Sequence, residues 1–152
     1  MHQPYEEQNA TVYQAPMLYV AVFYAILAAW TVIFVPLIIK KFVDGQISTV
    51  LFLVTVGLFS FSWYWSLGIF YKAVNDSNDT MRLVGFRRSI HLNFRDIFMV
   101  EGPPAPMFLG FIRFALENEK AYMFFYKKKS LTIILRAIQA SNPEIQFKRI
   151  SL

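Results

Sequence analysis

Residues able to act in catalysis or metal binding are few in this sequence. It has no cysteine and two histidines, His2 and His91, far apart in the chain. There is therefore no thiol nucleophile, disulfide or thiolate ligand, and no second histidine at metal-ligand spacing. Asp96 and Glu101 come closest to a carboxylate pair, but one lies where a strand pattern breaks and the other beside a proline turn. We therefore predict no catalytic residue, metal site, cofactor or small-molecule substrate.

The basic side chains are better candidates, and they suggest binding. Lys127, Lys128 and Lys129 precede a predicted helix, although the helix dipole disfavours cations at that end. Arg87 and Arg88 form a second group. Contact with anionic lipid headgroups, worth about 1 kcal/mol per basic group, would explain both groups. The alternative is a solvated surface that keeps the domain soluble. A nucleic-acid patch fits less well, because the aromatic residues are typical of a core.

Two long uncharged stretches, residues 16–39 and 46–71, precede these basic residues. As a helix, either one would extend about 36 Å or more, enough to cross a hydrocarbon layer of about 30 Å. A content of 56% hydrophobic residues agrees with this interpretation. The sequence predicts an integral membrane protein. A cleavable signal does not fit the acidic start of the chain and the long apolar stretch. An autonomous transporter does not fit helices without ionisable side chains.

Residues 40–45 are too few to recross a bilayer, so the two stretches should form a transmembrane helical hairpin over residues 16–71. Small residues allow helices to approach closely in lipid, and we expect the two helices to meet at such residues. The candidates are Ala21, Ala25, Ala28 and Ala29 in the first helix and Ser62 and Ser66 in the second.

The orientation of the hairpin depends on which charges dominate. More Lys and Arg residues follow the second helix than occupy the connection at Lys40 and Lys41, which favours both termini in the cytoplasm. The flanks of the first helix, with Glu6 and Glu7 before it, favour the opposite orientation. We expect the first arrangement.

The remaining sequence predicts a 1–15 tail, a 72–80 linker and a basic 81–152 domain. Alternating residues in 90–95 and 108–116, with a turn over 117–120, predict strands, and a short strand is expected over 144–150. The spacing of four apolar residues predicts a helix with Ser130 as its N-cap and Asn142-Pro143 as its end. These four residues are Leu131, Ile134, Leu135 and Ile138. The pattern indicates a small α+β domain, either an antiparallel sheet or a partial barrel with one C-terminal helix.

Three features together resemble small bacterial membrane proteins with a pleckstrin-homology-like (PH-like) domain. They are the hairpin, the strand pattern of residues 90–97, and a helix over 130–140 closed by Asn142-Pro143-Glu144-Ile145. The resemblance covers residues 47–150. It implies a helix against one end of a curved sheet, a bacterial inner membrane location, and binding or scaffolding instead of catalysis. Six expected strands, where such a domain has seven, leave barrel closure open.

We therefore expect a non-enzymatic, membrane-anchored accessory or scaffold protein. Its basic domain would use Arg87, Arg88 and residues 127–129 to bind a partner protein or anionic lipid headgroups. Expected partners are membrane lipids and another membrane protein or a second copy of the chain, without nucleic acid. One alternative is a small subunit of a multi-span transporter or membrane enzyme complex. Another is an immunity protein against a membrane-active toxin. N-glycosylation patterns begin at Asn9, Asn75 and Asn78, and matter only if these segments are lumenal in a eukaryote.

Overall fold

The computed structural model describes residues 11–77, 79–103, 109–117 and 119–150. The chain forms two compact units, one of residues 16–69 and one that joins residues before 16 to residues from 70 onward. We call them the hairpin unit and the sheet unit. Residues 1–10 of the predicted tail, with Asn9, lie outside the described residues, as does Asn78.

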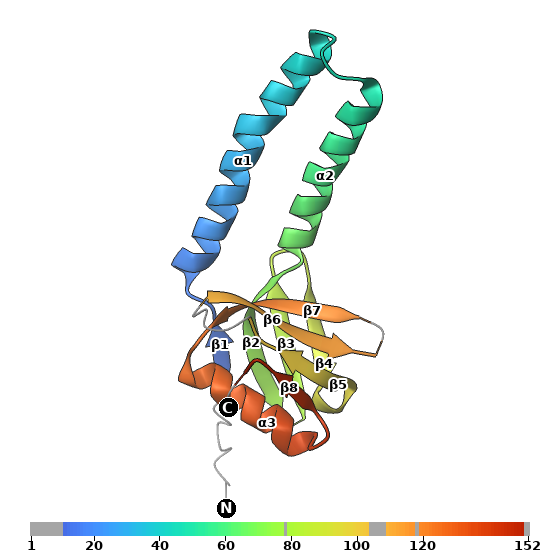
Figure 1. The fold of residues 1–152 in the computed structure, drawn as a ribbon. Coiled ribbons are helices and arrows are strands. Elements are labelled where there is room, and N and C mark those ends of the chain that lie inside the picture. Colours follow the sequence, from blue (N-terminus) through green and yellow to red (C-terminus); the bar gives the residue numbers. More distant parts are fainter. Residues whose placement is uncertain (1–10, 78, 104–108, 118, 151–152) are drawn as a thin grey trace, which may run out of the picture. The chain divides into compact units, whose positions relative to one another are not determined.

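The hairpin unit contains α1 (Met17–Val43) and α2 (Thr49–Leu67), shown in Figure 1. The Ser48 side chain caps α2 by accepting a hydrogen bond from the Leu51 amide at 3.3 Å. Gly45 turns the chain between the helices with a φ of 70°, a conformation that favours glycine. Both helices are long and apolar enough to cross a membrane, which confirms the prediction of two long apolar helices.

Polar and aromatic side chains hold α1 and α2 together. The Trp63 indole N–H donates to Thr31 Oγ1 at 2.8 Å, and the Tyr24 hydroxyl donates to the Ser66 carbonyl at 2.6 Å. Near the connection, the rings of Phe42 and Phe52 stack with centroids 4.4 Å apart. The contact therefore extends along the helices from Ser66 to the connecting turn.

Most of the small residues predicted at this contact lie elsewhere. Ser66 is buried and Ala28 is half-buried. The exposed ones are Ala21, Ala25, Ala29 and Ser62. The described contacts between the helices are instead made largely by aromatic side chains, two of which also form hydrogen bonds.

The sheet unit contains eight strands in the described part of the chain. These are β1 (Val12–Gln14), β2 (Phe70–Ser77), β3 (Thr80–Gly85), β4 (Ser89–Asn93), β5 (Ile97–Glu101), β6 (Leu109–Leu116), β7 (Lys120–Tyr126) and β8 (Gln146–Lys148). Their order is β4-β3-β2-β7-β6-β5-β8, with β1 paired to β2 as well. Within the described residues, the path ends at β4 and β8 and does not close into a ring.

The sheet is mixed, and the prediction of an antiparallel sheet is wrong at two places. β2 pairs in parallel with β7 through Phe70 and Met123, and β5 pairs in parallel with β8. Parallel neighbours need a crossover connection. In the second pair this crossover includes α3 (Lys129–Ser141), which lies between β7 and β8 in the chain.

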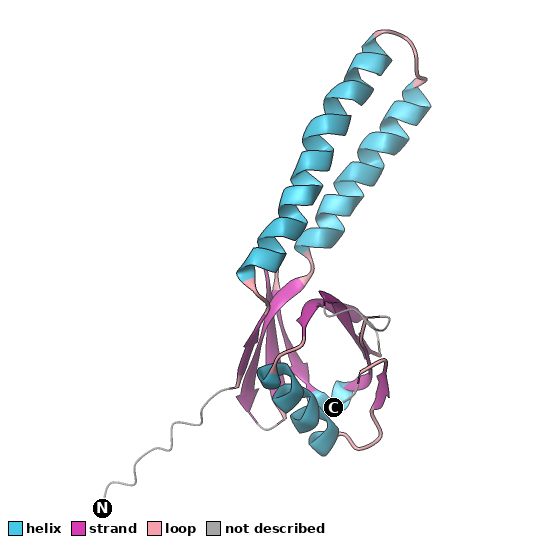
Figure 2. Cartoon of the chain, turned by 60° about the vertical axis from the view of Figure 1, so that its left-hand side comes forward, coloured by secondary structure: helices cyan, strands magenta, loops and turns pink. Residues whose placement is uncertain are grey.

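The strands curl around an interior that α3 covers (Figure 2). Leu131, Ile134, Leu135 and Ile138 are buried, as their spacing predicts. Ser130 is not the N-cap, contrary to the prediction. Lys128 has that position, since its carbonyl accepts hydrogen bonds from the amides of Leu131 and Thr132, and its side chain makes no capping hydrogen bond. At the other end, Asn142 donates from Nδ2 to the Ile97 carbonyl at 2.9 Å and ties the helix to β5.

Most of the predicted linker is strand, and so is a short segment of the predicted tail. Residues 72–77 belong to β2, and Val12 to Gln14 of the tail pair with it as β1. The hairpin unit is therefore an insertion between two neighbouring strands of the sheet unit. The tail strand was missed because the partners of β1 lie about 60 residues away in the chain. The end of β2 was missed because Asn75 to Ser77 have the polar composition of a loop.

Candidate functional site

The chain leaves the sheet unit and returns to it at a single edge. Gln14 is paired with Lys72, and the Ala15 amide donates to the Tyr71 carbonyl at 2.9 Å. Phe70, beside them in the chain, opens β2. We call these five residues the attachment edge. The two ends of the hairpin unit are thus fixed next to each other by strand pairing.

Tyr13 fixes β1 in the sheet unit. Its side chain is fully buried, and its hydroxyl donates to the Phe124 carbonyl at 2.9 Å. The same hydroxyl accepts from the Tyr126 amide at 2.8 Å. β1 is short, but it supplies a core residue and completes hydrogen bonds of β7.

The three predicted lysines lie beside the attachment edge. Lys128 Nζ donates to the Gln14 carbonyl at 3.2 Å and sits 6.0 Å from the centre of the Tyr126 ring. Lys127, Lys128 and Lys129 are all exposed. Lys129 is the first residue of α3, so the cations stand at the end of the helix that its dipole makes unfavourable for them.

The predicted arginines also reach this edge, on the turn from β3 to β4. Gly85 pairs with Phe70, and its amide donates to the Arg88 carbonyl at 2.9 Å, which closes the turn. Arg87 is exposed. The Arg88 guanidinium lies 3.4 Å from Glu119 and 5.5 Å from the centre of the Phe70 ring. Arg88 thus holds the turn against the sheet, a role that the sequence did not reveal.

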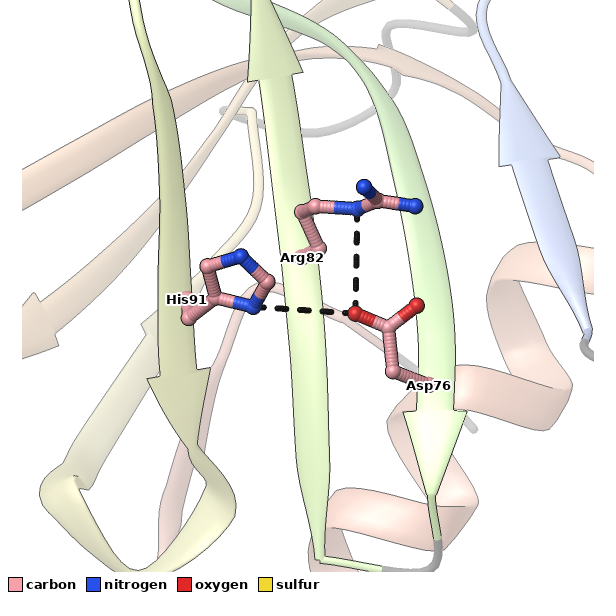
Figure 3. A network of polar contacts seen from close by, with 3 residues as sticks. All are labelled: Asp76, Arg82 and His91. Carbon is pink, nitrogen blue, oxygen red and sulfur yellow. Dashed lines mark ion pairs between the residues drawn. The ribbon is translucent and has the colours of Figure 1, made fainter.

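His91, the other candidate for chemistry, takes part in a contact between side chains of neighbouring strands. Figure 3 shows Asp76 on β2 facing Arg82 on β3 and His91 on β4, with Asp76 Oδ2 3.7 Å from both Arg82 Nε and His91 Nδ1. The His91 side chain is 71% exposed, as expected for the wet side of a strand. The trio is a cross-strand contact between solvent-accessible side chains.

Asp96 and Glu101, considered in the sequence as a carboxylate pair, have separate environments. Glu101 forms ion pairs with Arg113 and Arg149, and Asp96 is an exposed residue of the short 3-10 helix Phe94–Asp96. Within the described residues, no group of three His, Asp or Glu side chains could hold a metal ion. The predicted basic residues, in contrast, share one location, which is a basic surface around the attachment edge.

The fold and this surface define the class of molecule as a curled sheet domain with an apolar helical hairpin inserted between two strands. Comparisons of the chain with protein families, with curated proteins and with solved structures found no match.

Proposed function

We propose that this protein is anchored in a membrane by its hairpin unit and uses the basic surface around its attachment edge to bind anionic lipid headgroups. It acts as an accessory or scaffold protein without catalysis of its own. The curled sheet covered by one helix supports the PH-like interpretation and the binding role that goes with it.

The exposure of the helices supports membrane insertion. In the most apolar windows of α1 and α2, 0% and 6% of the residues are buried. Leu18, Val32 and Val50 are each more than 70% exposed. Core helices of soluble proteins bury such residues, and exposing them to water is unfavourable. α1, with about 40 Å of helix, is longer than the hydrocarbon layer of about 30 Å and would span it with some tilt. α2 ends at Leu67 and is shorter than expected, about 28 Å, but its 19 residues lie within the range of about 17–25 found for spanning helices.

The position of β1 is the main observation in favour of membrane anchoring, because a cleaved signal would not leave β1 in the sheet. A signal peptidase cut after α1 would separate β1 from the chain, and Tyr13 would be lost from the core. A single crossing would place β1 and β2 on opposite sides of the membrane. Their pairing fits an even number of crossings and hence a hairpin.

Chain length alone brings the basic residues to the headgroups. Gln14, beside Lys128, is three residues before α1, and Phe70, beside the β3–β4 turn, is three residues after α2. Three extended residues span about 10 Å, slightly more than the ~5–8 Å that the headgroup region adds on each side of the bilayer. These positions therefore lie at the membrane surface, where a long Lys or Arg side chain can reach the headgroups. This reasoning holds for any angle between the two units.

The test measures lipid selectivity of the full-length protein in neutral bilayers. A spin-labelled anionic lipid and a spin-labelled neutral lipid report their relative association with the protein. We expect the triple variant K127Q/K128Q/K129Q to lose most of the preference for the anionic lipid at low salt, since each cation contributes about 1 kcal/mol. High salt should weaken the preference of the wild type as well.

Arg95→Gln serves as the control. Arg95 is exposed and basic but belongs to the Phe94–Asp96 helix, whose Phe94 amide bonds to Asp79 at the far end of β2 and β3. It should leave lipid selectivity unchanged. Equal selectivity in the wild type and the triple variant would remove the headgroup proposal.

A second candidate is a subunit of a larger membrane complex or of a homo-oligomer. Ala21, Ala25 and Ala29 are four residues apart on α1 and all exposed, so another helix could approach closely there. Purification from native membranes in mild detergent distinguishes the two candidates. A subunit would bring a stoichiometric partner, and Ala25→Leu would release it, whereas an independent anchored protein would purify alone.

A further inference from the structure

The turn from β3 to β4 carries an exposed aromatic residue at the attachment edge. Phe86 is 51% exposed, and its ring centre lies 4.8 Å from that of Tyr71. A single exposed phenylalanine is common on soluble proteins and needs no special explanation. The location of this one, between the turn-closing Gly85 and exposed Arg87, makes it informative.

The turn is held firmly in place. Phe70 pairs with Gly85 on one side, and Arg88 is fixed by Glu119 and by the Phe70 ring on the other. Phe86 therefore stands on a short turn whose two ends are both bound to the sheet, with its ring against Tyr71. Phe70 follows the end of α2 by three residues, so the turn cannot be more than a short distance from that helix end.

We propose that this turn is a lipid-interface anchor. Phe86 enters the boundary between headgroups and acyl chains, and Arg87 contacts a lipid phosphate. An aromatic ring next to a guanidinium suits this depth, because the ring leaves water while the charge stays with the headgroups. The inference rests on the proposed membrane anchoring, and it adds an apolar contact that would orient the sheet unit against the bilayer.

The cysteine-free chain allows a test by site-directed spin labelling. A nitroxide at Ser89→Cys, exposed at the start of β4, reports on the turn and leaves Phe86 intact. Val54→Cys, exposed on α2, reports on insertion of the hairpin. Asp79→Cys, at the other end of the β2–β3 hairpin and about 25 Å away along β2, is the aqueous reference. The quantity measured is accessibility to oxygen, which concentrates in lipid, relative to a water-soluble nickel complex.

We expect the oxygen-to-nickel ratio at Ser89→Cys to be several-fold above that at Asp79→Cys. Phe86→Asp should lower it to the aqueous value, whereas Phe86→Leu should preserve it, and high salt should leave it largely unchanged. A ratio at Ser89→Cys equal to the aqueous reference, or one that Phe86→Asp does not alter, would overturn the anchor alone. An aqueous value at Val54→Cys would overturn the membrane anchoring itself.

Discussion

At the scale of single residues, Tyr13 is the most consequential side chain. Its hydroxyl serves both a carbonyl and an amide of β7. Tyr13→Phe leaves these buried groups without a partner, and we expect a loss of about 1–3 kcal/mol in the free energy of unfolding. Denaturation of the full-length protein in detergent measures it. Tyr126→Phe, which changes a half-buried ring beside Lys128, should stay within about 0.5 kcal/mol of the wild type.

At the scale of elements, the Thr31–Trp63 hydrogen bond is expected to stabilise the pairing of α1 with α2. Thr31→Val leaves the Trp63 indole N–H without its acceptor and should destabilise the hairpin by about 1 kcal/mol. A double-mutant cycle with Trp63→Phe, followed by unfolding in mixed micelles, measures the coupling. Thr55→Val is the matched control, because Thr55 bonds only to the Leu51 carbonyl of its own helix. If Thr31→Val and Thr55→Val destabilise the hairpin equally, the Thr31–Trp63 hydrogen bond does not contribute to the pairing of α1 with α2.

Elements with a local signal were predictable. The spacing of Leu131 to Ile138 identified the buried side of α3, and uncharged length identified both long helices. β1 carries no such signal, since three residues cannot establish a period and their partners come from beyond the hairpin. The basic groups were evident from the sequence, but their common location at the attachment edge depends on β1 and on the Phe70–Gly85 pairing. Long-range pairing is the information that local patterns lack.

At the scale of the whole molecule, the insertion makes a prediction about sidedness. The connection between the helices and the sheet unit should face opposite sides of the membrane. In intact bacterial cells, we expect a membrane-impermeant maleimide to label Asp44→Cys, in the connection. Asp79→Cys, in the sheet unit, should react only after permeabilisation. The reverse pattern would invert the orientation expected from the basic residues, and labelling of both from one side would contradict the hairpin.

The insertion of the hairpin between β1 and β2 also links biosynthesis to quality control. β1 leaves the ribosome first, yet it gains its partner only after both helices have been made. In a chain that crosses the bilayer once, Tyr13 would lie on the opposite side of the membrane from β7. The Phe124 carbonyl and the Tyr126 amide of β7 would then lack the Tyr13 hydroxyl as their partner. If the hairpin spans a membrane as proposed, only a correctly inserted chain can complete the sheet, and a misinserted chain should be more sensitive to proteases.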